Sequence, residues 1–113
     1  MTDRASATST AEVPTDRPNR YGKQLIAHLS RRSAGEWSDE TGTGWITFDA
    51  GRAELNSSDG ALLLRVAGDP DNVARLEDVV GRHLVRFGAR DELVVSWVRD
   101  DGTPGTEQRK TED

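Results

Sequence analysis

The sequence predicts a two-layer α+β domain, in which a mainly antiparallel sheet has two helices packed on one face. Two segments, near residues 20–32 and 70–87, repeat their apolar residues every three or four positions, as amphipathic helices do. Residues 36–66 and 93–98 instead alternate apolar and polar residues, as half-buried strands do. The predicted order is helix, three or four strands, helix, strand.

The first helix is expected to open near Arg20. Pro18 keeps the residue before it out of helical angles, and Asn19 is a favourable N-cap. The expected end is near Arg32, after two arginines that suit the negative end of the helix dipole. The apolar stripe consists of Tyr21, Leu25, Ile26 and Leu29.

A meander of short strands is expected next. The predicted strands are residues 36–39, 45–48, 52–56 and 61–66, with turns rich in Gly, Ser and Asp between them. Asp69 and Pro70 then resemble a helix start, with a capping carboxylate followed by Pro at the first helical position. This second helix carries the stripe Val73, Leu76, Val80, Leu84 and Phe87 and is expected to close at Gly88, before a last strand over 93–98.

Both ends of the chain are predicted to be disordered tails. Residues 1–17 contain a lone Val among Thr, Ser, Ala and charged residues, and residues 100–113 contain no large apolar residue, so neither segment offers much to bury. The predicted domain is therefore residues 18–99, and it is nearly neutral because the acidic excess lies mainly in the C-terminal tail.

Composition excludes several classes of protein. The chain of 113 residues has a formal net charge of -5 and no cysteine, which excludes disulfides, zinc–thiolate sites and thiol nucleophiles. No apolar run approaches the length of a membrane span and no signal peptide is evident, so a cytoplasmic protein is expected. No catalytic motif for acyl transfer, phosphate binding or zinc-dependent hydrolysis is present, so a protein that is not an enzyme is favoured. The sequence does not identify a cofactor.

The two histidines form one candidate site. His28 flanks the first apolar stripe and His83 lies within the second, so both are expected where the helices meet the sheet. Two converging imidazoles could ligate iron, another transition metal or haem. A half-buried histidine that only holds local structure is the commoner case, and a third donor is missing. A metal- or haem-dependent enzyme on His28 and His83 is therefore kept as an alternative.

The open face of the sheet forms a second candidate site. Strict alternation puts Trp45, Leu63, Val94 and Val98 on the face away from the helices. Such residues suit a protein partner or a homodimer, although scattered apolar residues are also ordinary on a surface. An RNA-binding module built on the arginines of the two helices is a further alternative, which the near-neutral domain disfavours.

Three segments together resemble a bacterial family catalogued as domain of unknown function 2218. They are TDRPNRYGKQLIAHLSRR, GRAELNSSDGALLLRVAGD and VARLEDVVGRHLVRFGARDELVVSWVR, and they cover about residues 15–99. The resemblance implies a small α+β domain without an assigned reaction, in a family often associated with iron–siderophore uptake. It also implies a second histidine on the first helix, where this chain has Arg31 instead.

The leading hypothesis is a small, non-catalytic accessory or binding domain with a link to iron–siderophore metabolism. Its candidate ligand-binding residues are Tyr21, Lys23, His28 and His83. Basic side chains beside them would suit a siderophore carboxylate or a flavin phosphate. The expected partners are such a ligand and a siderophore-related protein.

Overall fold

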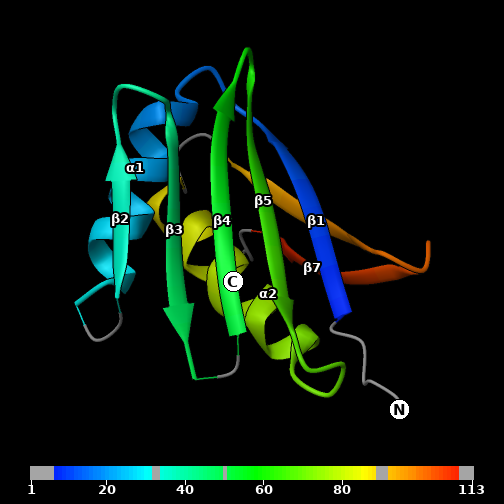
Figure 1. Ribbon diagram of the computed structural model, residues 1–113. Helices are drawn as coiled ribbons and strands as arrows, with labels where there is room; N and C mark the ends of the chain where they lie inside the picture. Colours follow the sequence, from blue (N-terminus) through cyan, green and yellow to red (C-terminus); the bar gives the residue numbers. More distant parts are fainter. Residues whose placement is uncertain (1–6, 32–33, 50, 89–91, 110–113) are drawn as a thin grey trace.

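A seven-stranded antiparallel sheet covered by two helices makes up the part of the chain that the computed structural model describes, residues 7–31, 34–49, 51–88 and 92–109 (Figure 1). The strands are β1 (Ala7–Pro14), β2 (Gly35–Ser38), β3 (Thr43–Phe48), β4 (Gly51–Ser58), β5 (Ala61–Gly68), β6 (Val94–Arg99) and β7 (Pro104–Arg109). The helices are α1 (Pro18–Leu29), between β1 and β2, and α2 (Val73–Phe87), between β5 and β6.

The strands lie in the order β2-β3-β4-β5-β1-β6-β7, and every neighbouring pair is antiparallel. Strands β2 to β5 form the predicted meander, joined by short turns. Strand β1 comes first in the described chain but lies inside the sheet, between β5 and β6. It therefore joins the meander to the β6–β7 hairpin.

Both helices pack on the same face of the sheet, as predicted. Along β5 the side chains of Leu62, Leu64 and Val66 are buried, whereas those of Leu63 and Arg65 are exposed. Figure 1 shows α1 and α2 together behind the sheet, and their buried stripes complete the core. The predicted α+β class and the helix, strand, helix, strand order are confirmed, with four strands between the helices.

The predictions of disordered ends over 1–17 and 100–113 were wrong for two segments. Residues Ala7–Pro14 form β1, and Pro104–Arg109 form β7, while residues 1–6 and 110–113 lie outside the described part. In β1 the small side chains of Ser9, Ala11 and Val13 are buried and alternate with exposed neighbours. An interior strand gains backbone hydrogen bonds on both sides, so it needs less apolar surface than composition suggested.

The helix boundaries also differ from the predictions. Helix α1 begins at Pro18, because a proline at the first helical position costs no hydrogen bond, and it ends at Leu29 with the Ser30 N–H bonded to the Ile26 carbonyl. Asp69 does not cap α2: the Asn72 N–H bonds to the Asp69 carbonyl in a preceding turn, and the helix begins at Val73. Neither helix is both long and apolar enough to cross a membrane.

Trp37 on β2 fits between two glycines, and this fixes α1 against the sheet. A β-carbon added at Gly22 of α1 would lie 2.5 Å from Cη2 of Trp37, and one added at Gly44 of β3 would lie 2.6 Å from its Cε3. The indole therefore has no room to move from one glycine toward the other. Close packing of this kind is lost when either position gains a methyl group.

We expect Gly22→Ala to lower the free energy of unfolding by about 1–2 kcal/mol. Alanine favours a helix by about 1 kcal/mol over glycine. The contact of 2.5 Å with Trp37 is so short that we expect overpacking to cost about 2–3 kcal/mol, the upper part of the usual range, which leaves a net loss of about 1–2 kcal/mol. Urea unfolding followed by tryptophan fluorescence measures the difference. The exposed Gln24→Ala on the same helix is the control and should change little. A Gly22→Ala protein as stable as the parent would contradict this packing.

Candidate functional site

His28 and His83 meet at the seam between the two helices. His28 lies in the last turn of α1 and His83 lies on α2, and their ring centroids are 5.1 Å apart with the planes tilted by 42°. Both histidines are half-buried: His28 precedes the half-buried Leu29, and His83 precedes the buried Leu84. The two apolar stripes, by packing side by side on the sheet, bring these rings together.

Each ring has a further contact that limits its movement. Phe87 of α2 lies edge-on to His28, with ring centroids 5.3 Å apart. Nδ1 of His83 lies 2.7 Å from the carbonyl oxygen of Val79, which can only accept a hydrogen bond. A neutral His83 therefore carries its proton on Nδ1 and leaves Nε2 with a free lone pair.

The seam is electropositive. Burial lowers the pKa of His28, and the neighbouring His83, Arg31 and Arg86 lower it further. These three are all basic, and no carboxylate contributes to this shift. We refer to His28, His83, Arg31 and Arg86 as the histidine seam. Its charge attracts anions and disfavours a bare cation.

One arginine of the seam could have been found from its spacing. Arg86 follows His83 by three residues on α2, so the two lie on one face of that helix. Arg31 also follows His28 by three residues, but α1 ends at Leu29, so Arg31 lies in the turn beyond the helix. Only the juxtaposition of α1 with α2 shows that the four side chains form one group.

Tyr21 and Lys23 do not share this arrangement. Tyr21 is buried in the core, with 7% of its surface exposed. Nζ of Lys23 lies 3.2 Å from Oδ2 of Asp39, a carboxylate that also accepts hydrogen bonds from the side chains of Asn19 and Trp37. The hydrogen bond from Lys23 is the main cause that lowers the pKa of Asp39. Lys23 thus takes part in a contact between α1 and the end of β2.

A metal site with three or more protein donors is not present among the residues that the structure describes. No group of at least three His, Cys, Asp or Glu side chains lies close enough together there. His28 and His83 alone could supply two nitrogen donors to one ion. Two imidazoles on one tetrahedral ion have ring centroids about 5 Å apart, given metal–nitrogen distances of about 2.0–2.1 Å, so their separation fits.

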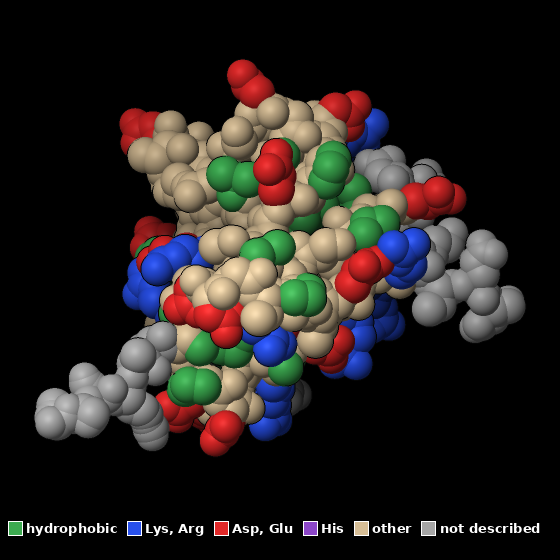
Figure 2. All heavy atoms as spheres, turned by 90° about the vertical axis from the view of Figure 1, so that its right-hand side faces the viewer, with side chains coloured by type: hydrophobic (Ala, Val, Ile, Leu, Met, Phe, Trp, Pro, Cys, Tyr) green, Lys and Arg blue, Asp and Glu red, His purple; other side chains and the backbone are tan. Residues whose placement is uncertain are grey.

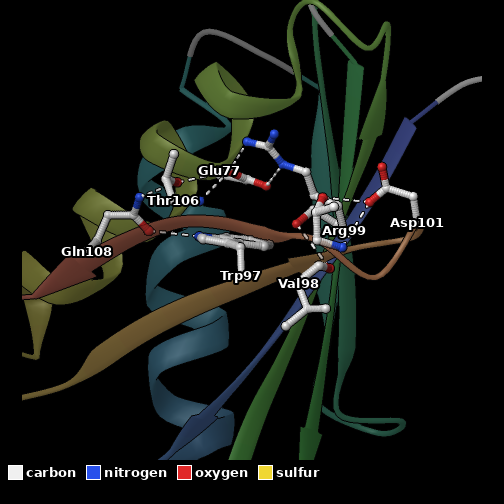
Figure 3. Close-up of polar contacts among 9 residues, drawn as sticks. Glu77, Trp97, Val98, Arg99, Asp101, Thr106 and Gln108 are labelled. Atoms are coloured by element: carbon white, nitrogen blue, oxygen red, sulfur yellow. Dashed lines mark hydrogen bonds and ion pairs between the residues drawn. The ribbon is translucent and has the colours of Figure 1, made fainter.

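Glu77 of α2 does not belong to the histidine seam and lies in a different, buried network (Figure 3). Its carboxylate accepts two hydrogen bonds from Arg99, from Nε and Nη2, both at 3.0 Å. The backbone N–H and the hydroxyl of Thr106 each donate to its Oε1 at 2.9 Å. Nearby, the Trp97 indole N–H donates to Oε1 of Gln108 at 2.7 Å.

The pKa of Glu77 reflects this network. Burial pushes the pKa up, but the hydrogen bonds from Arg99 and Thr106 outweigh burial and hold it below the ordinary value. Within the described residues no buried side-chain nitrogen or oxygen lacks a partner. Both carboxylate oxygens accept hydrogen bonds that tie α2 to β6 and β7, which makes this network structural.

Two of the four candidate interface residues are exposed to solvent, and the other two are half-buried. Leu63 and Val98 are exposed, at 37% and 52%, but Trp45 and Val94 are half-buried. The guanidinium carbon of Arg52 lies 5.0 Å from the centroid of the Trp45 ring, so part of that ring is covered. On α2, Arg82 is paired with Asp78 at 3.2 Å, which reduces the basic stripe that an RNA would need.

Comparison with known proteins gives a family and a fold. A family model described as an uncharacterized protein conserved in bacteria (DUF2218) matches residues 10–98. The NMR structure of PA4090 from Pseudomonas aeruginosa is similar, with a TM-score of 0.61 and 23% identity, over 85% of this chain and 97% of that one. At this identity the likeness concerns the fold alone. The comparison with curated proteins found no match.

Proposed function

Since the chain belongs to DUF2218, a family of uncharacterised bacterial proteins, we propose that it is a non-catalytic binding domain that takes a small anionic ligand at the histidine seam. The observation that carries this proposal is the contact of two imidazoles, 5.1 Å apart, in a setting made positive by Arg31 and Arg86. Guanidinium groups recognise carboxylates and phosphates through paired hydrogen bonds.

The seam supports binding more strongly than catalysis. General acid–base chemistry needs a reacting group held between an acid and a base, and no carboxylate contributes to the charge at His28. The link to iron metabolism that the family resemblance implies would make the ligand a carboxylate-bearing iron chelator. A flavin phosphate is the other anion that the same side chains could hold.

A second candidate is a transition metal ion bound by His28 and His83. The observation that favours it is the hydrogen bond from Nδ1 of His83 to the carbonyl oxygen of Val79. In many metal sites a carbonyl oxygen orients the histidine in this way, by accepting a hydrogen bond from the ring nitrogen that does not bind the metal. Two imidazoles leave other coordination positions to donors from a ligand. Arg31 and Arg86 oppose a bare cation, so this candidate is the weaker one.

We expect inorganic sulfate, followed by ¹H–¹⁵N NMR, to shift the resonances of His28, His83 and their neighbours. Arg86→Gln should weaken sulfate binding about tenfold, equivalent to about 1.4 kcal/mol. The matched control is Arg75→Gln, which removes an exposed arginine from the first turns of the same helix and should leave the affinity unchanged.

Titration with zinc or nickel ions distinguishes the second candidate. Tight metal binding that His28→Ala abolishes, with no response to sulfate, would replace the anion proposal with a metal site. Equal loss of sulfate affinity in Arg86→Gln and Arg75→Gln would show that the affinity depends on the net charge of the protein. That result would contradict a specific site at the histidine seam.

A further inference from the structure

A hollow lies on the outer face of the sheet, opposite the helices. Its cavity volume is about 500 Å³, within the range of about 300–1,000 Å³ typical of small-molecule sites. Residues of four strands line it, from β4, β5, β1 and β6; most of them face outward, and the buried Ala11 and Leu64 form part of its floor. It is separate from the histidine seam, which lies between the helices.

The pairing of β1 shows how the sheet forms this hollow. Strand β1 pairs with β5 from Ala7 as far as Pro14, but with β6 only at Ser9 and Thr10. Beyond Thr10 the two strands part, and side chains on either side of the division form the walls. Such a division in a sheet allows a ligand to approach between strands that are neighbours in the fold.

The hollow has an apolar surface of limited size. Leu63 and Val98 line it, and they are the exposed large hydrophobic residues among the described part of the chain. Figure 2 looks onto the side that carries β1 and β7, and shows hydrophobic side chains separated by polar and charged ones. A small apolar group fits this pattern better than the broad apolar face of a second protein.

The lining of the hollow carries two carboxylates, Glu12 and Glu54, and one cation, Arg65. Arg65 pairs with Glu54 at 3.3 Å, and Glu54 also pairs at 3.4 Å with Arg52, which is not part of the lining. Glu12, the cross-strand neighbour of Leu63, has no such ion pair among the residues that the structure describes. The hollow thus places a carboxylate without an ion-pair partner beside exposed aliphatic carbon.

We propose that the hollow binds an organic cation, with its apolar body against Leu63 and Val98 and its ammonium group beside Glu12. The complement of an unpaired carboxylate is a positive charge, and apolar surface next to it selects a cation that carries a hydrocarbon group. This ligand is opposite in charge to the one proposed for the histidine seam, so the two sites would not compete.

The test uses three probes with the same hydrocarbon chain: hexylammonium, hexanoate and hexanol. In ¹H–¹³C NMR titrations of the full chain, hexylammonium should shift the methyl signals of Leu63 and Val98 and bind about tenfold more tightly than hexanoate. Glu12→Gln should abolish this preference while hexanol binding stays the same. Glu36→Gln, an exposed glutamate on β2, is the control and should retain the preference.

Two results would overturn the proposal. One is equal binding of hexylammonium and hexanoate, or shifts that lie away from Leu63 and Val98. The other is self-association, detected by sedimentation at NMR concentrations and abolished by Leu63→Ser, which would show that a second copy occupies this face. Neither result bears on sulfate binding at the seam, so the two proposals fail independently.

Discussion

Replacing Glu77 with alanine is expected to lower the free energy of unfolding by about 3–5 kcal/mol, because it removes the buried partner of an ion pair, leaves buried donors unsatisfied and creates a cavity. The carboxylate is fully buried and accepts hydrogen bonds from Arg99 and from both donors of Thr106. Its removal leaves these donors unsatisfied and opens a cavity between α2 and β7. Since small domains are stable by about 5–15 kcal/mol, the loss is a large share.

The neighbouring residue provides a matched control. Asp78 lies on the same helix and pairs with Arg82, but both side chains are largely exposed. Asp78→Ala should therefore cost less than about 1 kcal/mol, as surface pairs do. Urea unfolding of both variants makes the comparison, and equal losses would contradict a special role for the buried network. Glu77→Gln keeps the shape of the side chain, and its loss of unfolding free energy should lie between those of Asp78→Ala and Glu77→Ala. It replaces Glu77→Ala in the comparison if that variant does not fold.

The same network predicts how stability depends on pH. The pKa of Glu77 is lower in the folded chain than its ordinary value of 4.5, so the unfolded chain takes up a proton first as pH falls. The ionised Glu77 therefore stabilises the folded chain fully above pH 4.5, and this contribution is lost as pH falls through the lower pKa of the folded state. The stability difference between the parent and Glu77→Gln should accordingly shrink below about pH 4.5.

Sulfate binding at the histidine seam should strengthen as pH falls, by about tenfold for each pH unit while one proton is taken up with the anion. Burial lowers the pKa of His28, and the neighbouring His83, Arg31 and Arg86 lower it further, so His28 resists protonation in the absence of an anion. A bound dianion reverses the sign of the local charge and favours a protonated His28. Sulfate is the suitable probe because it does not itself titrate near neutral pH.

Isothermal titration calorimetry between about pH 5.5 and 7.5, in buffers of different ionisation enthalpy, measures both the affinity and the proton uptake. His28→Gln should remove most of the pH dependence, whereas Arg75→Gln should retain it. Affinity that falls with acid would contradict the anion proposal and is the dependence expected of a metal ion, since protons compete with metals for imidazole.

Elements with strong periodicity could be predicted from the sequence, and those held by polar contacts could not. The stripes of α1 and α2 and the alternation of Leu62 to Val66 were sufficient for the class and for the face that the helices cover. Strand β7 has no large apolar residue and depends on the contacts of Thr106 and Gln108 with α2 and β6. The Asp101-Gly102 pair was an available hairpin signal, and Gly102 has a φ of +87°.

The candidate site was predictable in part for a similar reason. Facing stripes implied that His28 and His83 could meet, and their rings do lie in contact. Helix periodicity places Arg86 on the same face of α2 as His83, but it does not show how far one helix is shifted along the other. The contribution of Arg31, which lies beyond the end of α1, was therefore not evident. The partners of Lys23 and Glu77 depend on strands distant in the sequence, which no local pattern reveals.

The interior position of β1 has a consequence for how the chain folds. Its ladder with β5 joins Ala11 to Leu64, and its ladder with β6 joins Ser9 to Arg99, so both closures span long stretches of chain. High contact order of this kind slows folding, because loop entropy is lost before the contacts form. During synthesis residues 7–14 leave the ribosome before the other strands of the sheet, yet they remain without their neighbour β6 until Arg99 has emerged.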